Sequence, residues 1–208
     1  MQQRGGIIQK KSVKAQLSGP FLNIAHIVKG SRANGPGLRD VIWVQGCSRH
    51  CEGCQNSELQ PHFRRYIIPV SILINQIATR KDLIEGITIS GGEPLEQSAG
   101  LAELLVRIQE MDLSTMIYTG FEFEMLRDSS NPQIQRILSA TDILIDGPFI
   151  LTKKTQSTPW VGSSNQRIIC LTPRFSKKDI DAIDAPVQEY FIFPSISGDV
   201  TIVKTGIQ

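Results

Sequence analysis

Three of the four cysteines in this 208-residue chain lie within eight residues of one another. Cys47, Cys51 and Cys54 follow the spacing C-x3-C-x2-C. Three thiolates are one fewer than the four that complete a structural zinc site or an ordinary ferredoxin cluster. A [4Fe–4S] cubane held by three thiolates leaves one iron open to a chelating small molecule. The spacing therefore indicates an iron–sulfur site whose fourth position is available for chemistry.

The alternative for this loop is a zinc site completed by His50 or His62. His50 lies inside the loop and could not easily turn onto the same metal. The fourth cysteine, Cys170, stands in an apolar run and is predicted to be a buried, inert thiol rather than a ligand. Clustered cysteines are typical of ligands in a reducing compartment rather than of a disulfide framework.

A second motif, Ser-Gly-Gly-Glu-Pro at 90–94, begins 36 residues after Cys54 and follows a predicted strand. Two glycines let a backbone approach a ligand closely and adopt positive φ. Backbone groups of Gly91 and Gly92, with the Glu93 carboxylate, are predicted to hold a ligand's ammonium group. Glycine is common in strand-to-helix turns, so the pairing with the cysteine loop is what indicates a ligand site. A β-branched residue at position 92 is expected to weaken ligand binding and to leave the cluster intact.

The surrounding segments alternate between strand and helix patterns. Strands are predicted at 21–28, 41–45, 86–90, 115–118, 143–145 and 167–171, and helices around 70–77, 101–108 and 134–138. This order predicts an α/β fold of right-handed βαβ units with mainly parallel strands. Residues 46–47, 91–92, 119–120 and 146–147 follow strands directly, at the edge that carries the site in such folds. Because the helices are few and the chain is short, we expect an incomplete barrel.

Residues 1–20 are predicted to form a flexible segment, and 21–208 a single domain with 172–208 as a C-terminal extension. That extension contains strand candidates at 190–193 and 200–203 and a short helix near 180–183. The 22 basic and 20 acidic residues give a charge of +2, too small to argue for nucleic acid or a membrane surface. No segment approaches the ~20 apolar residues of a membrane span, and no secretory signal is evident. We therefore expect a cytoplasmic protein.

Taken together, these motifs resemble the radical S-adenosylmethionine (SAM) superfamily. The closer resemblance is to anaerobic ribonucleotide reductase activating proteins and other glycyl-radical-enzyme activases. It covers about residues 22–170, and the matching segments are 34–39, 45–47, 51–56, 89–95, 118–120, 142–149 and 160–167. The closer match depends mainly on 146–149 and 162–166.

The resemblance implies that SAM chelates the open iron of one three-cysteine [4Fe–4S] cluster and is cleaved reductively to a 5′-deoxyadenosyl radical. The implied substrate is a glycine Cα–H on a partner enzyme, an anaerobic ribonucleotide reductase as first choice. A flavodoxin- or ferredoxin-type protein would supply the electron. The alternatives are a radical SAM enzyme that modifies another peptide or a small molecule, and a non-catalytic zinc or iron–sulfur binding protein.

The resemblance also assigns roles to individual residues. Gly53 and Gln55 flank the cluster near the expected adenine. Thr119 and Asp146 could contact the ribose or a cation, although Asp146 also suits an ordinary Asp-Gly-Pro turn. Arg39 would support the cluster loop or form a surface salt bridge.

Overall fold

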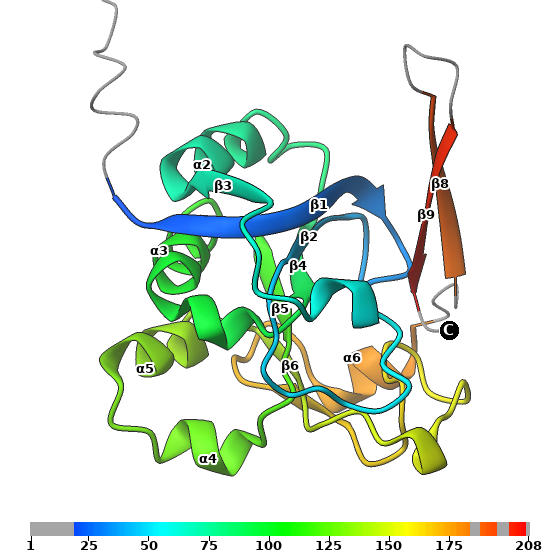
Figure 1. Ribbon diagram of the computed structural model, residues 1–208. Coiled ribbons are helices and arrows are strands. Elements are labelled where there is room, and N and C mark those ends of the chain that lie inside the picture. Colours follow the sequence, from blue (N-terminus) through cyan, green and yellow to red (C-terminus); the bar gives the residue numbers. More distant parts are fainter. Residues whose placement is uncertain (1–18, 184–187, 195–199, 207–208) are drawn as a thin grey trace, which may run out of the picture.

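The computed structural model describes residues 19–183, 188–194 and 200–206 (Figure 1). Residues 1–18 of the predicted flexible segment lie outside this range. A seven-stranded sheet in the order β3-β1-β2-β4-β5-β6-β7 forms the centre. Its strands are β1 (Phe21–Ser31), β2 (Arg39–Val44), β3 (Tyr66–Pro69), β4 (Gly86–Gly91), β5 (Ser114–Tyr118), β6 (Ile143–Asp146) and β7 (Arg167–Cys170).

The four central strands β2, β4, β5 and β6 are parallel to one another. This confirms the α/β fold with a mainly parallel centre, and the sheet is open, with β3 and β7 as its end strands. The outer strands β1, β3 and β7 are antiparallel. A parallel β7 would need a crossover connection, usually a helix. Between β6 and β7 the chain forms only loops and the short 3-10 helix η3 (Leu151–Lys153), so β7 runs back beside β6.

Two elements were not expected from the sequence. Strand β3 has the sequence Tyr-Ile-Ile-Pro, which lacks the alternation of apolar and polar residues that marks a half-buried strand, and its first two side chains are exposed. Helix α4 (Phe123–Arg127) is a little over one turn long and buries only Leu126, which is too short for a helical period to show.

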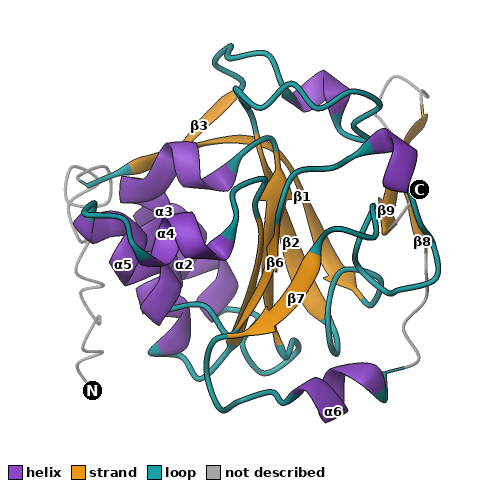
Figure 2. Cartoon of the chain, turned by 90° about the horizontal axis from the view of Figure 1, so that it is seen from below, coloured by secondary structure: helices purple, strands orange, loops and turns teal. Residues whose placement is uncertain are grey.

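Helices cover one face of the sheet (Figure 2). They are α2 (Val70–Ala78), α3 (Ser98–Gln109), α4 and α5 (Pro132–Ser139). The main hydrophobic core lies between these helices and strand residues such as Ile87, Ile89 and Ile117. This burial fixes the register of the central strands, because a slip of one residue would turn the apolar side chains away from the helices.

Loops cover the opposite face, where smaller clusters form. One contains Met116, Ile143 and Trp160, and another contains Val41 and Trp43. The short helix α6 (Lys177–Asp181) lies near the first of these clusters through Ile180. Two further 3-10 turns, η1 (Ser57–Leu59) and η2 (Pro94–Gln97), follow the cysteine loop and the Gly-Gly-Glu turn. The face without large helices therefore has room for a ligand.

The C-terminal extension forms a separate two-stranded antiparallel hairpin of β8 (Gln188–Pro194) and β9 (Val200–Gly206). Both strand candidates are confirmed. Figure 1 shows the hairpin beside the end of β1. In the part of the chain that is described, no helix is long and apolar enough to cross a membrane.

Arg39 is fully buried at the start of β2. Its guanidinium donates to Thr88 Oγ1 (2.9 Å), Pro36 O (3.0 Å), Ile87 O (2.6 Å), Ser114 Oγ (2.7 Å) and Ser114 O (3.1 Å). Burial lowers its pKa to about 10. Neither role expected for Arg39 is seen: it is not at the surface, and it ties together the amino ends of β2, β4 and β5, at the edge away from the cysteines.

Candidate functional site

One cavity, of about 130 Å³, brings together all but two of the ten residues singled out in the sequence. These eight are Cys47, Cys51, Cys54, Gln55, Gly91, Gly92, Glu93 and Thr119. They follow the carboxyl ends of β2, β4 and β5, where loops of parallel strands meet. Gly53 and Asp146 do not line it.

The cysteine loop is held by backbone hydrogen bonds to the turn that follows it. Gly46 N donates to Leu59 O (2.8 Å), and Cys47 N donates to Gln60 O (2.9 Å). All three thiols are free, with Cys47 buried and the other two half-buried. Arg49 N donates to Cys47 Sγ (3.4 Å), and burial raises the pKa of the Cys47 and Cys54 thiols. Binding to a metal cluster would therefore have to displace their protons.

The Gly-Gly-Glu turn is joined to the cysteine loop by main-chain contacts. Gly91 has φ +111°, and a Cβ atom there would lie 2.4 Å from Val44 N. Glu93 N donates to Gly46 O (2.8 Å), and Asn56 Nδ2 donates to Gly91 O (3.3 Å). Only glycine allows this close approach, so the two motifs form one unit.

Glu93 is almost completely buried, with 1% of its surface exposed. Its carboxylate accepts hydrogen bonds from Thr119 Oγ1 (2.9 Å), Gly120 N (2.8 Å) and Leu95 N (3.1 Å). Burial raises its pKa, although these hydrogen bonds act in the other direction. Glu93 thus joins the ends of β4 and β5. A carboxylate offers about four lone pairs, so an ammonium contact with a ligand stays a prediction that the geometry leaves room for.

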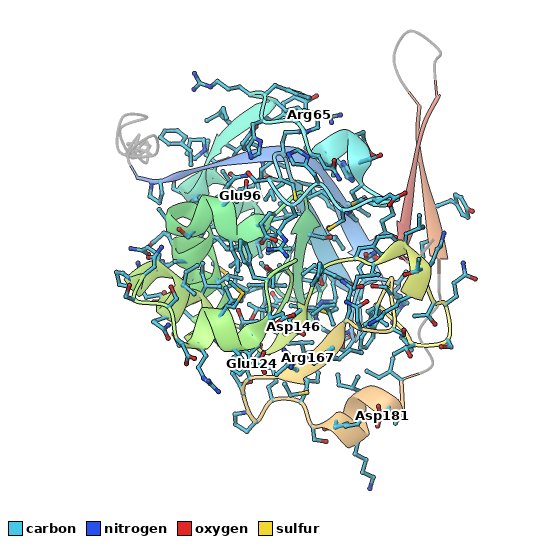
Figure 3. The ribbon with its side chains drawn as sticks, turned by 60° about the horizontal axis from the view of Figure 1, so that its bottom comes forward. Arg65, Glu96, Glu124, Asp146, Arg167 and Asp181 are labelled. Atoms are coloured by element: carbon cyan, nitrogen blue, oxygen red, sulfur yellow. The ribbon has the colours of Figure 1, made fainter. Side chains whose placement is uncertain are left out.

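Asp146 is buried and faces other protein groups. It accepts from Phe123 N (2.8 Å) and forms an ion pair with Arg167, which also pairs with Glu124 (2.7 Å; Figure 3). Its neighbour Gly147 lines the cavity instead. Arg167 pairs with both carboxylate oxygens of Asp146, and the expected contact with ribose or a cation stays a prediction.

Gly53 allows the loop to adopt a left-handed backbone conformation at this position. Its φ is +68°, and a Cβ atom there would lie 2.7 Å from Leu151 Cδ1. It provides the left-handed residue between Cys51 and Cys54, where most side chains would be strained. Its expected place near adenine remains untested, whereas Gln55 lies on the cavity wall.

The histidines that could complete a zinc site are not on the cavity wall. His62 Nε2 lies 2.7 Å from Glu96 Oε2, and Ser48 N donates to the other oxygen of Glu96 (2.8 Å). Among residues 19–183 and the described parts of the hairpin, no three His, Cys, Asp or Glu side chains form a group that could hold a metal ion. The fit to a larger cluster depends on three free thiols around one cavity, whose wall contains no fourth cysteine and no histidine in the described part of the chain.

The cavity is also lined by residues to which the sequence analysis assigned no role, although most of them lie within the matching segments. They are Asn34, Trp43, Arg49, Asn56, Ser90, Tyr118, Gly120, Phe149, Trp160, Gly162 and Gln166. Trp43 and Ser90 are register partners on β2 and β4. The alternation of side chains along a strand could have identified these two residues, because every second side chain points to the same face of the sheet.

Trp160 has two unusual properties at this wall. Its φ is +66°, and its buried indole N–H has no hydrogen-bond partner among the residues described. Buried polar groups are nearly always paired in native proteins. A ligand with hydrogen-bond acceptors would fit a cavity with such a donor in its lining.

Comparison with known proteins agrees with this geometry. Residues 33–169 match the family described as a 4Fe-4S single cluster domain. An anaerobic ribonucleoside-triphosphate reductase-activating protein of Enterobacteria phage T4 is 30% identical over 166 residues, which are 76% of this chain and all of the relative. The protein of that name from Vibrio cholerae serotype O1 is 32% identical over 143 residues, 65% of this chain and 89% of the relative.

A solved structure, QueE from Escherichia coli, is also similar, with 16% identity and a TM-score of 0.42. The similarity covers 54% of this chain and 58% of that one, and nothing below depends on it. The sequence matches confirm the resemblance that the motifs indicated. The chain belongs to the 4Fe-4S single-cluster domain family and to the family of anaerobic ribonucleoside-triphosphate reductase-activating proteins.

Proposed function

We propose that this protein is a radical SAM activating enzyme that generates a glycyl radical on an anaerobic ribonucleotide reductase. The observation that carries the proposal is the shared cavity of the three cysteines and the Gly91–Gly92–Glu93 turn. When bound, the cluster and SAM would together supply the 5′-deoxyadenosyl radical that removes a hydrogen atom from glycine. The relatives named as reductase activators support the choice of partner.

Cys47, Cys51 and Cys54 would hold the cluster as thiolates. The loop presents them from one short segment, braced on Leu59 and Gln60 by two backbone hydrogen bonds. Donation from Arg49 N to Cys47 Sγ stabilises negative charge on that sulfur. Three protein ligands leave one coordination position for SAM.

The Gly-Gly-Glu turn would bind the methionine end of SAM. Gly91 and Gly92 present backbone without side chains, so a ligand can approach the main chain closely. Glu93, held by Thr119 and Gly120, would contribute negative charge beside the ammonium group. Gln55 and Thr119 line the same cavity and are candidates for contacts with the nucleoside part.

The remaining wall would exclude water and admit the substrate. Trp43, Tyr118, Phe149 and Trp160 supply apolar surface. Burial raises the pKa of Tyr118, so its hydroxyl keeps its proton and stays a neutral donor. A segment of the partner that enters the cavity would close it as a lid does.

The test is anaerobic reconstitution followed by three measurements. Iron and sulfide are measured per chain, and 5′-deoxyadenosine is measured after reduction by dithionite or by a flavodoxin- or ferredoxin-type donor. The reduced protein, SAM and an anaerobic ribonucleotide reductase are then mixed, and an electron paramagnetic resonance spectrum is recorded. A glycyl doublet on the reductase is expected.

Matched cysteine variants provide the control. Cys47→Ala should lose cluster and SAM cleavage, whereas Cys170→Ala, on β7 and outside the cavity, should keep both. One zinc per chain without sulfide would contradict the proposal at its first step. SAM cleavage without a doublet on any reductase tested would favour modification of another peptide or a small molecule.

A further inference from the structure

Glu189 on β8 joins the C-terminal hairpin to the loop that follows β1. Its carboxylate accepts from Ser31 Oγ (2.6 Å), Arg32 N (3.0 Å) and Ala33 N (3.2 Å). Successive backbone N–H groups that converge on one anion form a nest, and hydrogen bonds to a charged acceptor are stronger than neutral ones. The hairpin is thus joined to this loop through a charged contact.

The contact continues from Ser31 to the cavity wall. Ser31 is fully buried, and its Oγ accepts from Asn34 Nδ2 (2.8 Å). A hydroxyl has one proton and two lone pairs. Because Ser31 Oγ donates its proton to Glu189, the lone pairs of that oxygen remain available to accept from Asn34. Asn34 O also accepts from Thr88 Oγ1 (2.6 Å), so both the side chain and the main chain of Asn34 are fixed.

Asn34 lines the same cavity as the cysteines, and its main-chain oxygen contacts Thr88 in the middle of β4. Asn34 precedes the amino end of β2, whereas Cys47 follows the carboxyl end of that strand. A six-residue strand spans about 20 Å. If cluster and SAM bind at the cysteine end, as in the proposed function, Asn34 faces the space that remains for the substrate.

We propose that Asn34 recognises the main chain of the glycine-bearing segment of the partner, and that Glu189 is the positioning residue that holds Asn34 in place. An asparagine amide has one acceptor oxygen and two N–H donors, and Ser31 takes one of these donors. The remaining N–H and oxygen match the C=O and N–H of a peptide group. The family match ends at residue 169, before the hairpin. The contact of Glu189 with the loop that holds Asn34 therefore comes from a segment outside the matched region.

The inference rests on the proposed function and is tested on the full-length reconstituted enzyme. Glu189→Ala, Asn34→Ala and the double variant are compared with wild type for SAM cleavage without partner and for glycyl radical formation against reductase concentration. Each single variant should raise the KM for the reductase about tenfold, which corresponds to about 1.4 kcal/mol. In Glu189→Ala, whose side chain is not on the cavity wall, SAM cleavage without partner should stay within about twofold of wild type.

The double variant should be no worse than either single one, because both changes remove the same contact. Glu189→Gln, which keeps an acceptor oxygen, should recover part of the loss. Glu110→Ala, an exposed carboxylate at the end of α3, is the matched control and should behave as wild type. Hydrogen exchange at residues 31–34 should be faster in Glu189→Ala than in wild type.

Several results would overturn the inference while leaving the proposed function in place. They are a wild-type KM in Glu189→Ala, additive losses in the double variant, or unchanged exchange at residues 31–34. Equal loss of SAM cleavage and radical transfer would indicate a general structural role, and this too would overturn it. Wild-type enzyme that cleaves SAM but forms no glycyl radical would instead remove the proposed function and, with it, the peptide contact of Asn34.

Discussion

Gly92 packs directly against the backbone of Gly46. A Cβ atom at position 92 would lie 2.0 Å from Gly46 O and 2.6 Å from its carbonyl carbon. Cys47 follows Gly46, and Glu93 N donates to Gly46 O (2.8 Å). The turn proposed to bind SAM and the loop proposed to bind the cluster therefore share a contact that leaves no room for a side chain.

Gly92→Val should consequently reduce both iron content and SAM affinity. This differs from the expectation drawn from sequence alone, in which the cluster would survive, because the side chain would push on the cysteine loop itself. Iron per chain and SAM binding by equilibrium dialysis measure the two effects. Gly30→Ala is the control for backbone strain without a clash, since its φ is +79° but the nearest neighbour of its Cβ would be 3.7 Å away. Full iron content in Gly92→Val would contradict the role given to this contact.

Glu93→Ala should destabilise the protein by about 3 kcal/mol or more. The change leaves Thr119 Oγ1, Gly120 N and Leu95 N without their acceptor, and each buried unpaired donor costs about 1–3 kcal/mol. Glu93→Gln keeps one acceptor oxygen and should lose about half as much. Urea denaturation of the cluster-free protein measures both. Equal stability of Glu93→Ala and wild type would show that these hydrogen bonds contribute nothing to the fold.

Arg39→Lys should cost at least about 3 kcal/mol, because an ammonium group cannot reach the spread of acceptors that the guanidinium satisfies. The folded fraction should still bind a full complement of iron, since Arg39 lies at the opposite edge of the sheet. Denaturation midpoints and iron per folded chain check the two parts. Arg80→Lys, at an arginine whose side chain is partly exposed beside the buried Asp40, should cost less. Iron loss in folded Arg39→Lys would argue for the role in the cluster loop.

His26 should make the protein less stable in mild acid. Its ring stacks on Trp43 at 4.5 Å, and burial, with the nearby charge of Arg65, lowers its pKa from 6.5 to about 4. The unfolded chain binds this proton more tightly, so stability falls as the pH drops from about 6.5 towards 4. Allowing for partial solvent exposure, the loss between pH 7 and 5 is on the order of 1 kcal/mol.

His26→Phe keeps the stacked ring and removes the titration. Urea midpoints at the two pH values should therefore differ less in this variant than in wild type. His62→Gln, at an exposed histidine, is the comparison and should keep the wild-type difference. An identical pH dependence in His26→Phe and wild type would exclude His26 as the source.

The sequence by itself determined which residues gather at the site and most of the elements around it. Cys47, Cys51 and Cys54 lie in one short loop, and the Gly-Gly-Glu turn is equally local, so residue spacing alone identifies them. The strands and helices that carry these loops follow from the periodicity of apolar residues. Parallel strands then bring their carboxyl ends to one edge, and this is why separate motifs meet in one cavity.

Only the tertiary structure decided which distant groups meet. Arg167 pairs with Asp146 although 20 residues separate them in the chain, and Glu189 contacts Ser31 across most of the sequence. The burial of Arg39 could not be predicted from the sequence either, because the sequence does not show whether an arginine donates to water or to protein oxygens. Local patterns report the conformation of neighbours, whereas hydrogen bonds between distant segments depend on how the strands pair and how the loops cover the sheet.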